Sequence, residues 1–330
     1  MSDPARVRLG LVGCGRIAQA YLDAIAHVPT AELCAVVDAH EPAALAAAER
    51  GACLASTDPH DPALLAAVDA VIVCTPPATH AALTTHFLER GLHVLCEKPL
   101  TLDIASAQRL VELAAAQQRQ LLMASKFRYV ADVVQARAIL ESGALGRLVL
   151  FENTFCSKVD MAGRWNSDRT VAGGGVLIDN GSHSVDIIRY LLGPIVSVQA
   201  QAAAKVQALD VEDTVRLQCR TESGVLCCVD LSWSLYKEQD DYIAVYGTDG
   251  TLRVGWKGSA WRQHGGAGWV PFGSGYAKAQ AFAAQVANFC GAVQGREPPL
   301  ITPDEVLDSV RVVEAGYRAL AAASWVTVGR

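Results

Sequence analysis

A glycine-rich segment near the start of the chain, GLVGCGRIAQAYLDAI, restricts the possible folds more than any other feature. Gly13, Gly15 and Ala18 follow a strand-like apolar run and precede a stretch with helical spacing of apolar residues. In this context the first glycine makes a tight turn, the second lets a phosphate approach the backbone, and the small third residue packs helix on strand. The pattern therefore predicts a dinucleotide-binding βαβ unit, with N–H groups of the helix facing the phosphates.

The rest of the first 125 residues alternates short apolar runs with Ala-rich helical stretches. Strands that are apolar throughout and separated by helices are typical of a parallel sheet covered on both faces. We therefore expect an α/β fold, a doubly wound parallel Rossmann sheet, in a domain of residues 1–125. The expected strands are 7–13, 31–38, 70–76, 93–99 and 120–126, and the first helices are 16–27 and 42–50.

The pattern changes after residue 126, where strand-like segments follow one another closely. TESGVL and YGTDGTL indicate hairpin turns, because Ser-Gly and Asp-Gly supply residues with positive φ. Successive hairpins predict an antiparallel sheet, hence a second, α+β domain over residues 126–330. Its expected strands are 148–158, 195–206, 213–220, 224–234, 241–247 and 250–256, and its helices are 130–142, 277–294 and 303–324, the last with Pro303 in its first turn.

The composition limits the possible partners and compartments. A net charge of −6 disfavours nucleic acid and anionic membranes, and no run of about 18 apolar residues predicts a membrane span. The opening MSDPARVRLGLVG lacks the pattern of a signal peptide. The ten cysteines are scattered without CxxC pairs, which is typical of buried free thiols in a reducing compartment. We therefore expect a cytoplasmic protein.

Asp38 lies at the end of the second expected strand, where dinucleotide-binding domains place an acidic residue. A carboxylate there accepts hydrogen bonds from the ribose hydroxyls of NAD and repels the 2′-phosphate of NADP. Ala39 and His40 follow it and supply no arginine for a phosphate, so NAD is favoured over NADP. The alternative is that Asp38 only caps the helix that begins near Pro42.

Two further segments follow strands of the same sheet. CTPPATH places Thr75, Pro76 and His80 where they could line the cofactor, although His80 alone is equally consistent with an ordinary helix start. CEKPL places Glu97 and Lys98 at the mouth of the same site. A partly desolvated lysine can hydrogen-bond an alcohol or carbonyl oxygen; the alternative is a solvent-exposed turn.

The segment AGGGVLIDNGSHSVD carries Asp179 and His183 four positions apart, behind a glycine cluster. This spacing puts both side chains on one face of a helix. They are either a catalytic pair, with the glycines letting a loop approach the cofactor, or a helix-start carboxylate and a buried histidine. A Ser182–His183–Asp186 triad is disfavoured because no G-x-S-x-G elbow accompanies it. A metal site is also disfavoured, since His80, His86 and His93 fall in different elements.

In this order and spacing, the GxGxxA segment, Asp38, TPPATH, EKP and GGGVLIDNGSHSVD resemble the Gfo/Idh/MocA family of oxidoreductases. The resemblance extends to the closing ITPDEVLDSVRVVEAGYRAL and so covers nearly the whole chain. It implies a Rossmann domain, a second domain with an open, mostly antiparallel sheet, and assembly into a homodimer or homotetramer. It also implies NAD-dependent oxidation of a secondary alcohol on a sugar or polyol, or the reverse ketone reduction.

The resemblance assigns roles to individual residues. Lys98 matches the family's catalytic lysine, and Asp179 and His183 match the acid and histidine of its DxGxH motif. A histidine titrates near neutral pH and can take the hydroxyl proton, while Lys98 would stabilise the charge that develops on that oxygen. The expected cofactor-binding residues are Gly13, Gly15, Arg16, Ile17, Ala18, Asp38, Thr75, Pro76, His80, Glu97, Lys98 and Trp165, and the expected substrate-binding residues are Lys126, Arg128, Arg164, Trp165 and Asn180.

One segment, SKFRYV, departs from the family pattern, because Lys126 stands where an asparagine is common, two residues before Arg128. Lys126 and Arg128 could hold an anionic substrate group, or both could pair with acids of the second domain. In the polar stretch 159–175, Arg164 and Trp165 resemble positions near the nicotinamide and the substrate, although Trp165 could instead pack under the loop. Tyr276 resembles another position at the cofactor's edge.

Three rival functions remain open at this point. The substrate could be a phosphorylated or nucleotide-linked sugar, as Lys126 and Arg128 suggest. The chain could be a nucleotide-sensing regulator without activity, although such a protein has no need of Lys98, Asp179 and His183. It could also be a bifunctional oxidoreductase that never releases its cofactor.

Overall fold

The computed structural model describes residues 6–329, which belong to two compact units. The first unit contains the chain up to Lys126 together with Lys278–Leu307, and the second contains Phe127–Ala277 and Asp308–Arg330. The units thus differ from a division into 1–125 and 126–330, because the chain returns to the first unit near its end. The physical reason is apolar packing: Phe282, Val286 and Phe289 are fully buried in the core cluster that also contains Tyr21.

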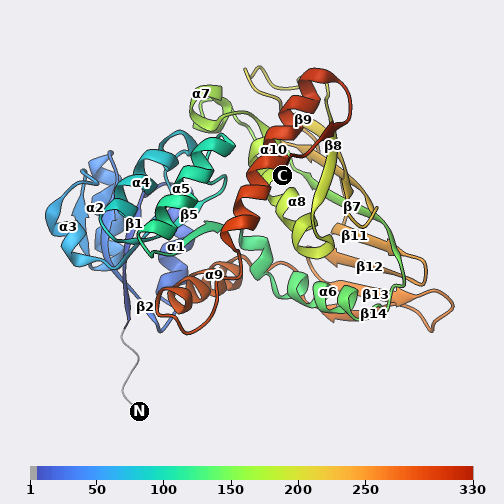
Figure 1. Ribbon diagram of the computed structural model, residues 1–330, viewed down its shortest axis with the longest axis horizontal. Helices are drawn as coiled ribbons and strands as arrows, with labels where there is room; N and C mark the ends of the chain where they lie inside the picture. The colour runs from blue at the N-terminus through green and yellow to red at the C-terminus, as the bar shows by residue number, and fades with distance from the viewer. Residues whose placement is uncertain (1–5, 330) are drawn as a thin grey trace, which may run out of the picture. The chain divides into compact units, whose positions relative to one another are not determined.

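The first unit is a Rossmann sheet of six parallel strands in the order β3-β2-β1-β4-β5-β6 (Figure 1). The predicted doubly wound α/β fold is confirmed, and the chain order reverses between β1 and β4, where such sheets bind ligands. The short edge strand β3 was not predicted. The strands are β1 (Val7–Val12), β2 (Ala31–Val37), β3 (Leu54–Ser56), β4 (Ala70–Val73), β5 (His93–Glu97) and β6 (Leu121–Ala124); the helices are α1 (Arg16–Ile25), α2 (Glu41–Gly51), α3 (Pro62–Ala67), α4 (His80–Glu89), α5 (Ile104–Ala116) and α9 (Lys278–Val293).

The second unit is built on an open sheet of nine strands in the order β14-β13-β12-β11-β7-β10-β9-β8-β15. All neighbours are antiparallel except β7 and β10, so the predicted mostly antiparallel sheet is confirmed. The strands β13, β14 and β15 were not predicted. The strands are β7 (Leu148–Cys156), β8 (Ile195–Ala202), β9 (Thr214–Thr221), β10 (Leu226–Ser232), β11 (Asp241–Gly247), β12 (Gly250–Gly255), β13 (Ser259–Gln263), β14 (Val270–Gly273) and β15 (Val326–Thr327).

Helices α6 (Ala131–Glu141) and α8 (Val176–Leu192) pack against this sheet (Figure 1). The short helix α7 (Arg169–Ala172) precedes α8, and α10 (Pro303–Ala322) runs from the end of the first unit into the second. Pro303 begins α10 as predicted. The carboxylate of Glu305 accepts a hydrogen bond from the Thr302 N–H at 2.9 Å, which completes a capping box at this helix start.

Both predicted hairpins are present, but their glycines act differently. Gly224, between β9 and β10, has a φ of +88°, so this turn needs the positive φ that glycine supplies. Gly250, which begins β12 after β11, is outside the positive-φ region. A Cβ there would lie 2.6 Å from the carbonyl oxygen of Arg262, so the second glycine is required by close packing, not by turn type.

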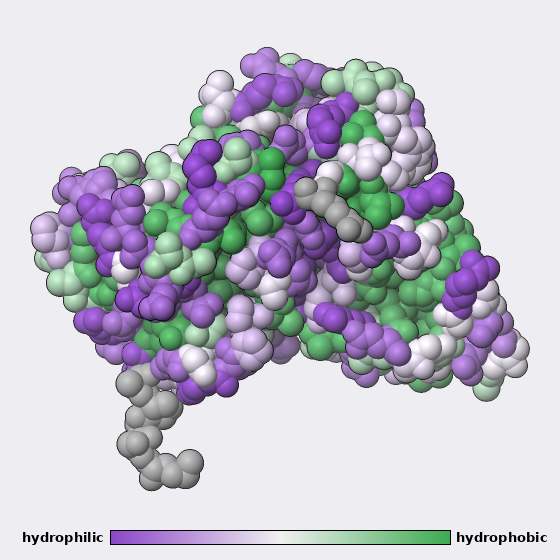
Figure 2. All heavy atoms as spheres, viewed as in Figure 1, coloured by the Kyte–Doolittle hydropathy of each residue, from purple (hydrophilic) through white to green (hydrophobic). Residues whose placement is uncertain are grey.

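One face of the nine-stranded sheet is covered and the other carries exposed side chains. Leu150 on β7 is 44% exposed and Leu226 on β10 is 43% exposed, and the two are register partners. Tyr246 on β11 is the next partner of Leu150 in the same row. Figure 2 shows hydrophilic residues over much of the visible surface and hydrophobic residues gathered over strands of this sheet.

Neither membrane spans nor disulfides are found in residues 6–329. No helix in this range is long and apolar enough to cross a membrane. The ten cysteines are free thiols, of which six are buried and four are half-buried, so the prediction of buried free thiols is confirmed for six of them.

Candidate active site

The glycine-rich loop after β1 has one glycine that the protein itself requires and one that it does not. Gly13 has a φ of +90°, and a Cβ there would lie 2.8 Å from the backbone of Cys74 and Thr75. A Cβ on Gly15 would meet no protein atom within 4 Å. Gly15 is also the N-cap residue of α1, and no side chain caps this helix start. Open space beside uncapped helix N–H groups fits the pyrophosphate of a dinucleotide.

Asp38 is bound to this loop. Its Oδ2 accepts a hydrogen bond from the Cys14 N–H at 2.7 Å, and its Oδ1 accepts one from the His40 N–H at 2.8 Å. The alternative role of Asp38 as the cap of α2 is not observed, because His40 occupies the N-cap position and no side chain caps the helix. Each carboxylate oxygen keeps a second lone pair, so Asp38 can still accept bonds from ribose hydroxyls.

His80 joins the segments that follow β4 and β5. It is fully buried, and its Nδ1 and Nε2 each lie 2.8 Å from a carbonyl oxygen, of Pro99 and Thr75 respectively. Burial lowers the pKa of His80, and it outweighs the two carbonyls, which favour the protonated ring. The imidazole therefore lies between two loops, and in its neutral form it donates a hydrogen bond to one of these two carbonyl oxygens. Within residues 6–329, no group of three or more His, Cys, Asp or Glu side chains could hold a metal ion.

Glu97 ends β5, and Lys98 follows it. Both are partly buried, so this segment is not a fully exposed turn. The two oxygens of Glu97 accept hydrogen bonds from the Tyr21 hydroxyl at 2.8 Å and from the Lys98 N–H at 3.1 Å. Burial raises the pKa of Glu97, against the lowering effects of the Lys98 charge, the Tyr21 hydroxyl and the Lys126 charge.

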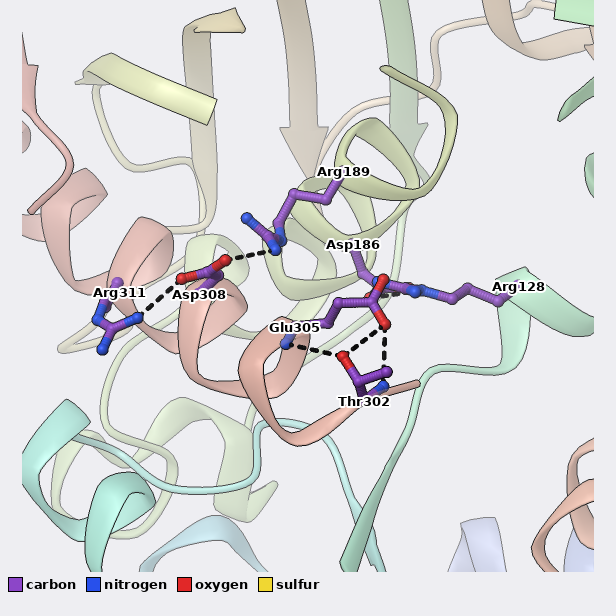
Figure 3. Close-up of polar contacts among 7 residues, drawn as sticks. All are labelled: Arg128, Asp186, Arg189, Thr302, Glu305, Asp308 and Arg311. Carbon is purple, nitrogen blue, oxygen red and sulfur yellow. Dashed lines mark hydrogen bonds and ion pairs between the residues drawn. The ribbon is translucent and has the colours of Figure 1, made fainter. Parts of the chain in front are cut away.

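Arg128 is engaged within the second unit (Figure 3). Its Nη2 lies 2.8 Å from Oδ1 of Asp186, and both side chains are only 1% exposed. Of the two alternatives for Arg128, the structure shows the pairing with an acid. Lys126 lies in the first unit, partly buried, with its Nζ 5.8 Å from the centre of the Phe282 ring.

Asp179 and His183 lie on α8, one turn apart and both partly buried. The presence of glycines before α8 can be explained without the hypothesis that they let a loop approach a cofactor. A Cβ on Gly174 would collide with the Tyr317 hydroxyl, and one on Gly175 would lie 2.0 Å from the Glu212 carbonyl oxygen. The two glycines are therefore required because Tyr317 and the backbone of Glu212, both in the second unit, pack closely against them.

Glu212 and Tyr317 together hold the start of α8. The Oε1 atom of Glu212, which is 8% exposed, accepts hydrogen bonds from the Gly175 N–H at 2.9 Å, the Leu177 N–H at 3.3 Å and the Tyr317 hydroxyl at 2.7 Å. A carboxylate at a helix N-terminus is also favoured by the helix dipole. Farther along α8, Arg189 pairs with Asp308 of α10 at 2.7 Å (Figure 3).

The surroundings of His183 are aromatic. The ring of Phe127 lies 5.1 Å from the imidazole, centre to centre, and Tyr276 stacks on Phe127 at 5.4 Å. Asn180, on the same helix, donates to the Phe155 carbonyl at 3.5 Å. A catalytic triad with Ser182 and Asp186 is excluded here, since Asp186 pairs with Arg128 and Ser182 donates to the Ile178 carbonyl.

The polar stretch before α8 presents its tryptophan to solvent. Trp165 is 44% exposed, so it does not pack under the loop. Arg164 beside it is partly buried and precedes a short 3₁₀ turn, Trp165–Ser167.

Four supporting residues were not predicted from the sequence: Tyr21, Gln285, Glu212 and Tyr317. Tyr21 and Tyr317 fall on helices with apolar patterns, where an aromatic residue predicts only core packing. Gln285 and Glu212 carry no motif. Their partners lie far away in the sequence, so no local pattern identifies them.

These features define an oxidoreductase with a dinucleotide-binding Rossmann unit, and comparison with known proteins agrees. Residues 7–125 match the model of an oxidoreductase family with an NAD-binding Rossmann fold, and residues 133–253 match the GFO/IDH/MocA C-terminal domain. The chain therefore belongs to the Gfo/Idh/MocA family of oxidoreductases.

Three similar proteins extend over almost the whole chain. The rhizopine catabolism protein MocA of Rhizobium meliloti is 29% identical over 319 residues, which are 96% of this chain and 95% of that protein. Inositol 2-dehydrogenase of Rhizobium meliloti (strain 1021) is 26% identical over 331 residues, 96% of this chain and 97% of that protein. The crystal structure of GenD2 from gentamicin A biosynthesis, in complex with NAD, has a TM-score of 0.88 and 27% identity, covering 100% of this chain and 98% of GenD2.

Proposed function

We propose that the protein is an NAD-dependent dehydrogenase acting on a secondary alcohol, or the corresponding ketone, of a sugar, cyclic polyol or sugar derivative. The observation that carries this proposal is the meeting of three features at one edge of the parallel sheet. The glycine loop, Asp38 and the Glu97–Lys98 pair all follow strand ends there. The family and the inositol 2-dehydrogenase relative support the reaction class.

In this proposal the first unit binds the cofactor and the second supplies further groups for the substrate. When bound, NAD supplies the nicotinamide carbon that exchanges the hydride. Lys98 hydrogen-bonds the substrate oxygen and stabilises the negative charge that develops on it. His183 accepts the hydroxyl proton during oxidation and returns it during reduction. Asp179, one turn away, orients the imidazole or the substrate.

Substitution of the two reactive residues tests this assignment. Lys98→Ala and His183→Ala should each lower kcat by a factor of about 10² to 10⁴, the usual contribution of such groups. NAD binding, followed by quenching of tryptophan fluorescence, should change little. His264→Ala, an exposed histidine of the same unit as His183, is the matched control and should keep full activity. Normal turnover in either active-site variant would refute the assignment.

Asp38 should determine the choice of nucleotide. Asp38→Ala removes a charged acceptor for the ribose hydroxyls and the repulsion of a 2′-phosphate. We expect the KM for NAD to rise about 10- to 100-fold, as for the loss of a charge-assisted hydrogen bond, while the KM for NADP falls. Steady-state kinetics with both nucleotides measure this ratio. An unchanged preference would mean that other residues select the cofactor.

The substrate class needs a direct test, because Arg128 no longer supports an anionic substrate. Its ion pair with Asp186 uses the guanidinium inside the second unit. Turnover of myo-inositol, free hexoses, hexose phosphates and nucleotide sugars should therefore favour the uncharged compounds. Preference for the phosphorylated or nucleotide-linked sugars would select the alternative, and absence of turnover with all would favour a nucleotide-sensing regulator.

We also propose that the protein forms a homodimer or homotetramer through the exposed face of the nine-stranded sheet. Leu150 and Leu226 form an apolar pair on that face, each more than two-fifths exposed. Burial of such a pair against a second copy would be favourable. Light scattering measures the mass directly, and a monomer at micromolar concentration would contradict the proposal.

A further inference from the structure

A buried chain of hydrogen bonds in the first unit ends on the glutamate beside Lys98. The amide Nε2 of Gln285 on α9 donates to the Tyr21 hydroxyl at 2.9 Å. The Tyr21 hydroxyl, on α1, donates in turn to Oε1 of Glu97 at 2.8 Å. Tyr21 and Gln285 are both fully buried, so water does not compete for these bonds.

The direction of this chain matters because each donor points toward Glu97. A tyrosine has one hydroxyl proton, and here that proton is used on the carboxylate while the amide donates to the hydroxyl oxygen. The other carboxylate oxygen accepts the Lys98 N–H at 3.1 Å. Both oxygens of Glu97 are thus held by donors of the protein, an arrangement that favours its ionised form.

Packing on α9 strengthens this arrangement. Phe282 lies three residues before Gln285 on the same helix face, and its ring contacts the Tyr21 ring edge-on at 4.9 Å. This contact supports the position of the Tyr21 ring, whose hydroxyl donates to Glu97. The other groups that face Glu97 are the charges of Lys98 and Lys126 and the buried thiols of Cys74 and Cys96.

We propose that Tyr21 and Gln285 are positioning residues of the active site, which hold the Glu97 carboxylate by hydrogen bonds against the effect of its burial and thereby fix the backbone from which Lys98 extends. The proposal rests on the role of Lys98 given above. It assigns a part in the reaction to α9, which lies outside both segments that match the family models. Loss of the Tyr21 hydroxyl should raise the pKa of Glu97, since that hydroxyl lowers it.

Titration of Glu97 tests the hydrogen-bond chain without reference to activity. The full-length protein is labelled with ¹³C-carboxyl glutamate, and the Glu97 signal is the one missing from Glu97→Gln. Tyr21→Phe keeps the ring but removes the hydroxyl, so the Glu97 signal should titrate about one pH unit higher, the equivalent of one hydrogen bond. Gln285→Leu should shift it in the same direction by less. Phe289→Leu, in the core one turn farther along α9, is the control for lost packing and should leave it unchanged.

Kinetics then test the part played in the reaction. In ketone reduction His183 acts in its protonated form and does not limit activity at low pH, so the acid limb of the pH profile of kcat for this direction should move to higher pH in Tyr21→Phe by the same amount, about tenfold in rate on that limb. In a Glu97→Gln background, Tyr21→Phe should cause no such shift. An unmoved Glu97 titration in Tyr21→Phe overturns the inference, as does a kinetic shift that persists without Glu97. Full turnover in Lys98→Ala would instead refute the proposed function and leave the titration result standing.

Discussion

The two compact units place their polar residues by different means. In the first unit, Asp38 and Thr75 follow parallel strands and Glu97 ends one, so one edge of one sheet collects residues that are far apart in the sequence. In the second unit, Asp179 and His183 lie on a helix packed against a mostly antiparallel sheet. A parallel sheet gathers residues from many strand ends, whereas a helix presents residues close in sequence. The positions of Asp179 and His183 therefore depend on the placement of a single helix, α8.

Both units nevertheless rely on a helix near the end of the chain. In the first, Gln285 of α9 reaches Glu97 through Tyr21. In the second, Tyr317 of α10 holds Glu212, which caps the start of α8. The difference is that the support in the first unit acts on one carboxylate, while the support in the second acts on a whole helix. Changes to the two supports should therefore have different consequences.

The largest expected effects come from glycines at positions where a Cβ atom would clash with the backbone of another segment. Gly13→Ala combines a positive φ with a Cβ 2.8 Å from backbone atoms, and Gly175→Ala places a Cβ 2.0 Å from the Glu212 carbonyl oxygen. We expect each to lower the free energy of unfolding by about 3 kcal/mol or more, measured by urea unfolding. Gly15→Ala meets no protein atom and should fold normally but bind NAD weakly. Wild-type stability of Gly13→Ala would contradict the close packing of the two loops.

A smaller effect is expected at the capped start of α8. Glu212→Ala removes an acceptor for two N–H groups and the Tyr317 hydroxyl, which should cost about 2 kcal/mol of stability. Glu212→Gln keeps an oxygen acceptor and Tyr317→Phe keeps the carboxylate, so each should cost about 1 kcal/mol. Because Asp179 and His183 lie on this helix, kcat should fall along with stability. Unchanged kcat in Glu212→Ala would mean that the helix holds its position without the cap.

The smallest expected effect is a difference between the two units in how their stability depends on pH. Burial lowers the pKa of His80, and it is the largest cause of the lowered pKa of His86 and His93 as well. These histidines all belong to the first unit. As the pH falls through about 6.5, these histidines become protonated in the unfolded chain but not yet in the folded one. The free energy of unfolding of the first unit therefore decreases as the pH falls below this value. Glu97 acts in the opposite sense near pH 4.5, because its pKa is raised.

In the second unit, Asp213 is one of the carboxyl groups with a lowered pKa. Burial tends to raise its pKa, but hydrogen bonds from the N–H groups of Gln207 and Val206 and from the Ser234 hydroxyl lower it overall. Its contribution is therefore present above about pH 4 and lost below. Hydrogen exchange between pH 6.5 and 5, corrected for the intrinsic rate, should show weaker protection in the first unit alone. His80→Asn should flatten this dependence, and equal loss of protection in both units would contradict it.

Much of the architecture was predictable because its causes are local. Apolar runs and their spacing gave the strands of the parallel sheet, and the position of Asp38 after a strand pointed to its place beside the glycine loop. Strands β13 and β14 escaped prediction because they lie in a segment rich in Gly and Trp without alternation. Arg128 could not be assigned to Asp186 because the two are 58 positions apart.

The sequence by itself determined the family, the nucleotide-binding loop and the positions of Lys98, Asp179 and His183, because each depends on a short pattern of neighbouring residues. Only the tertiary structure showed why glycines are required at positions 174 and 175 before α8, and which residues form the hydrogen-bond chain to Glu97. Those answers depend on close contacts with Tyr317, Glu212, Tyr21 and Gln285. Tyr21 and Gln285 are 264 positions apart in the chain, and such pairs are set by the packing of the whole unit.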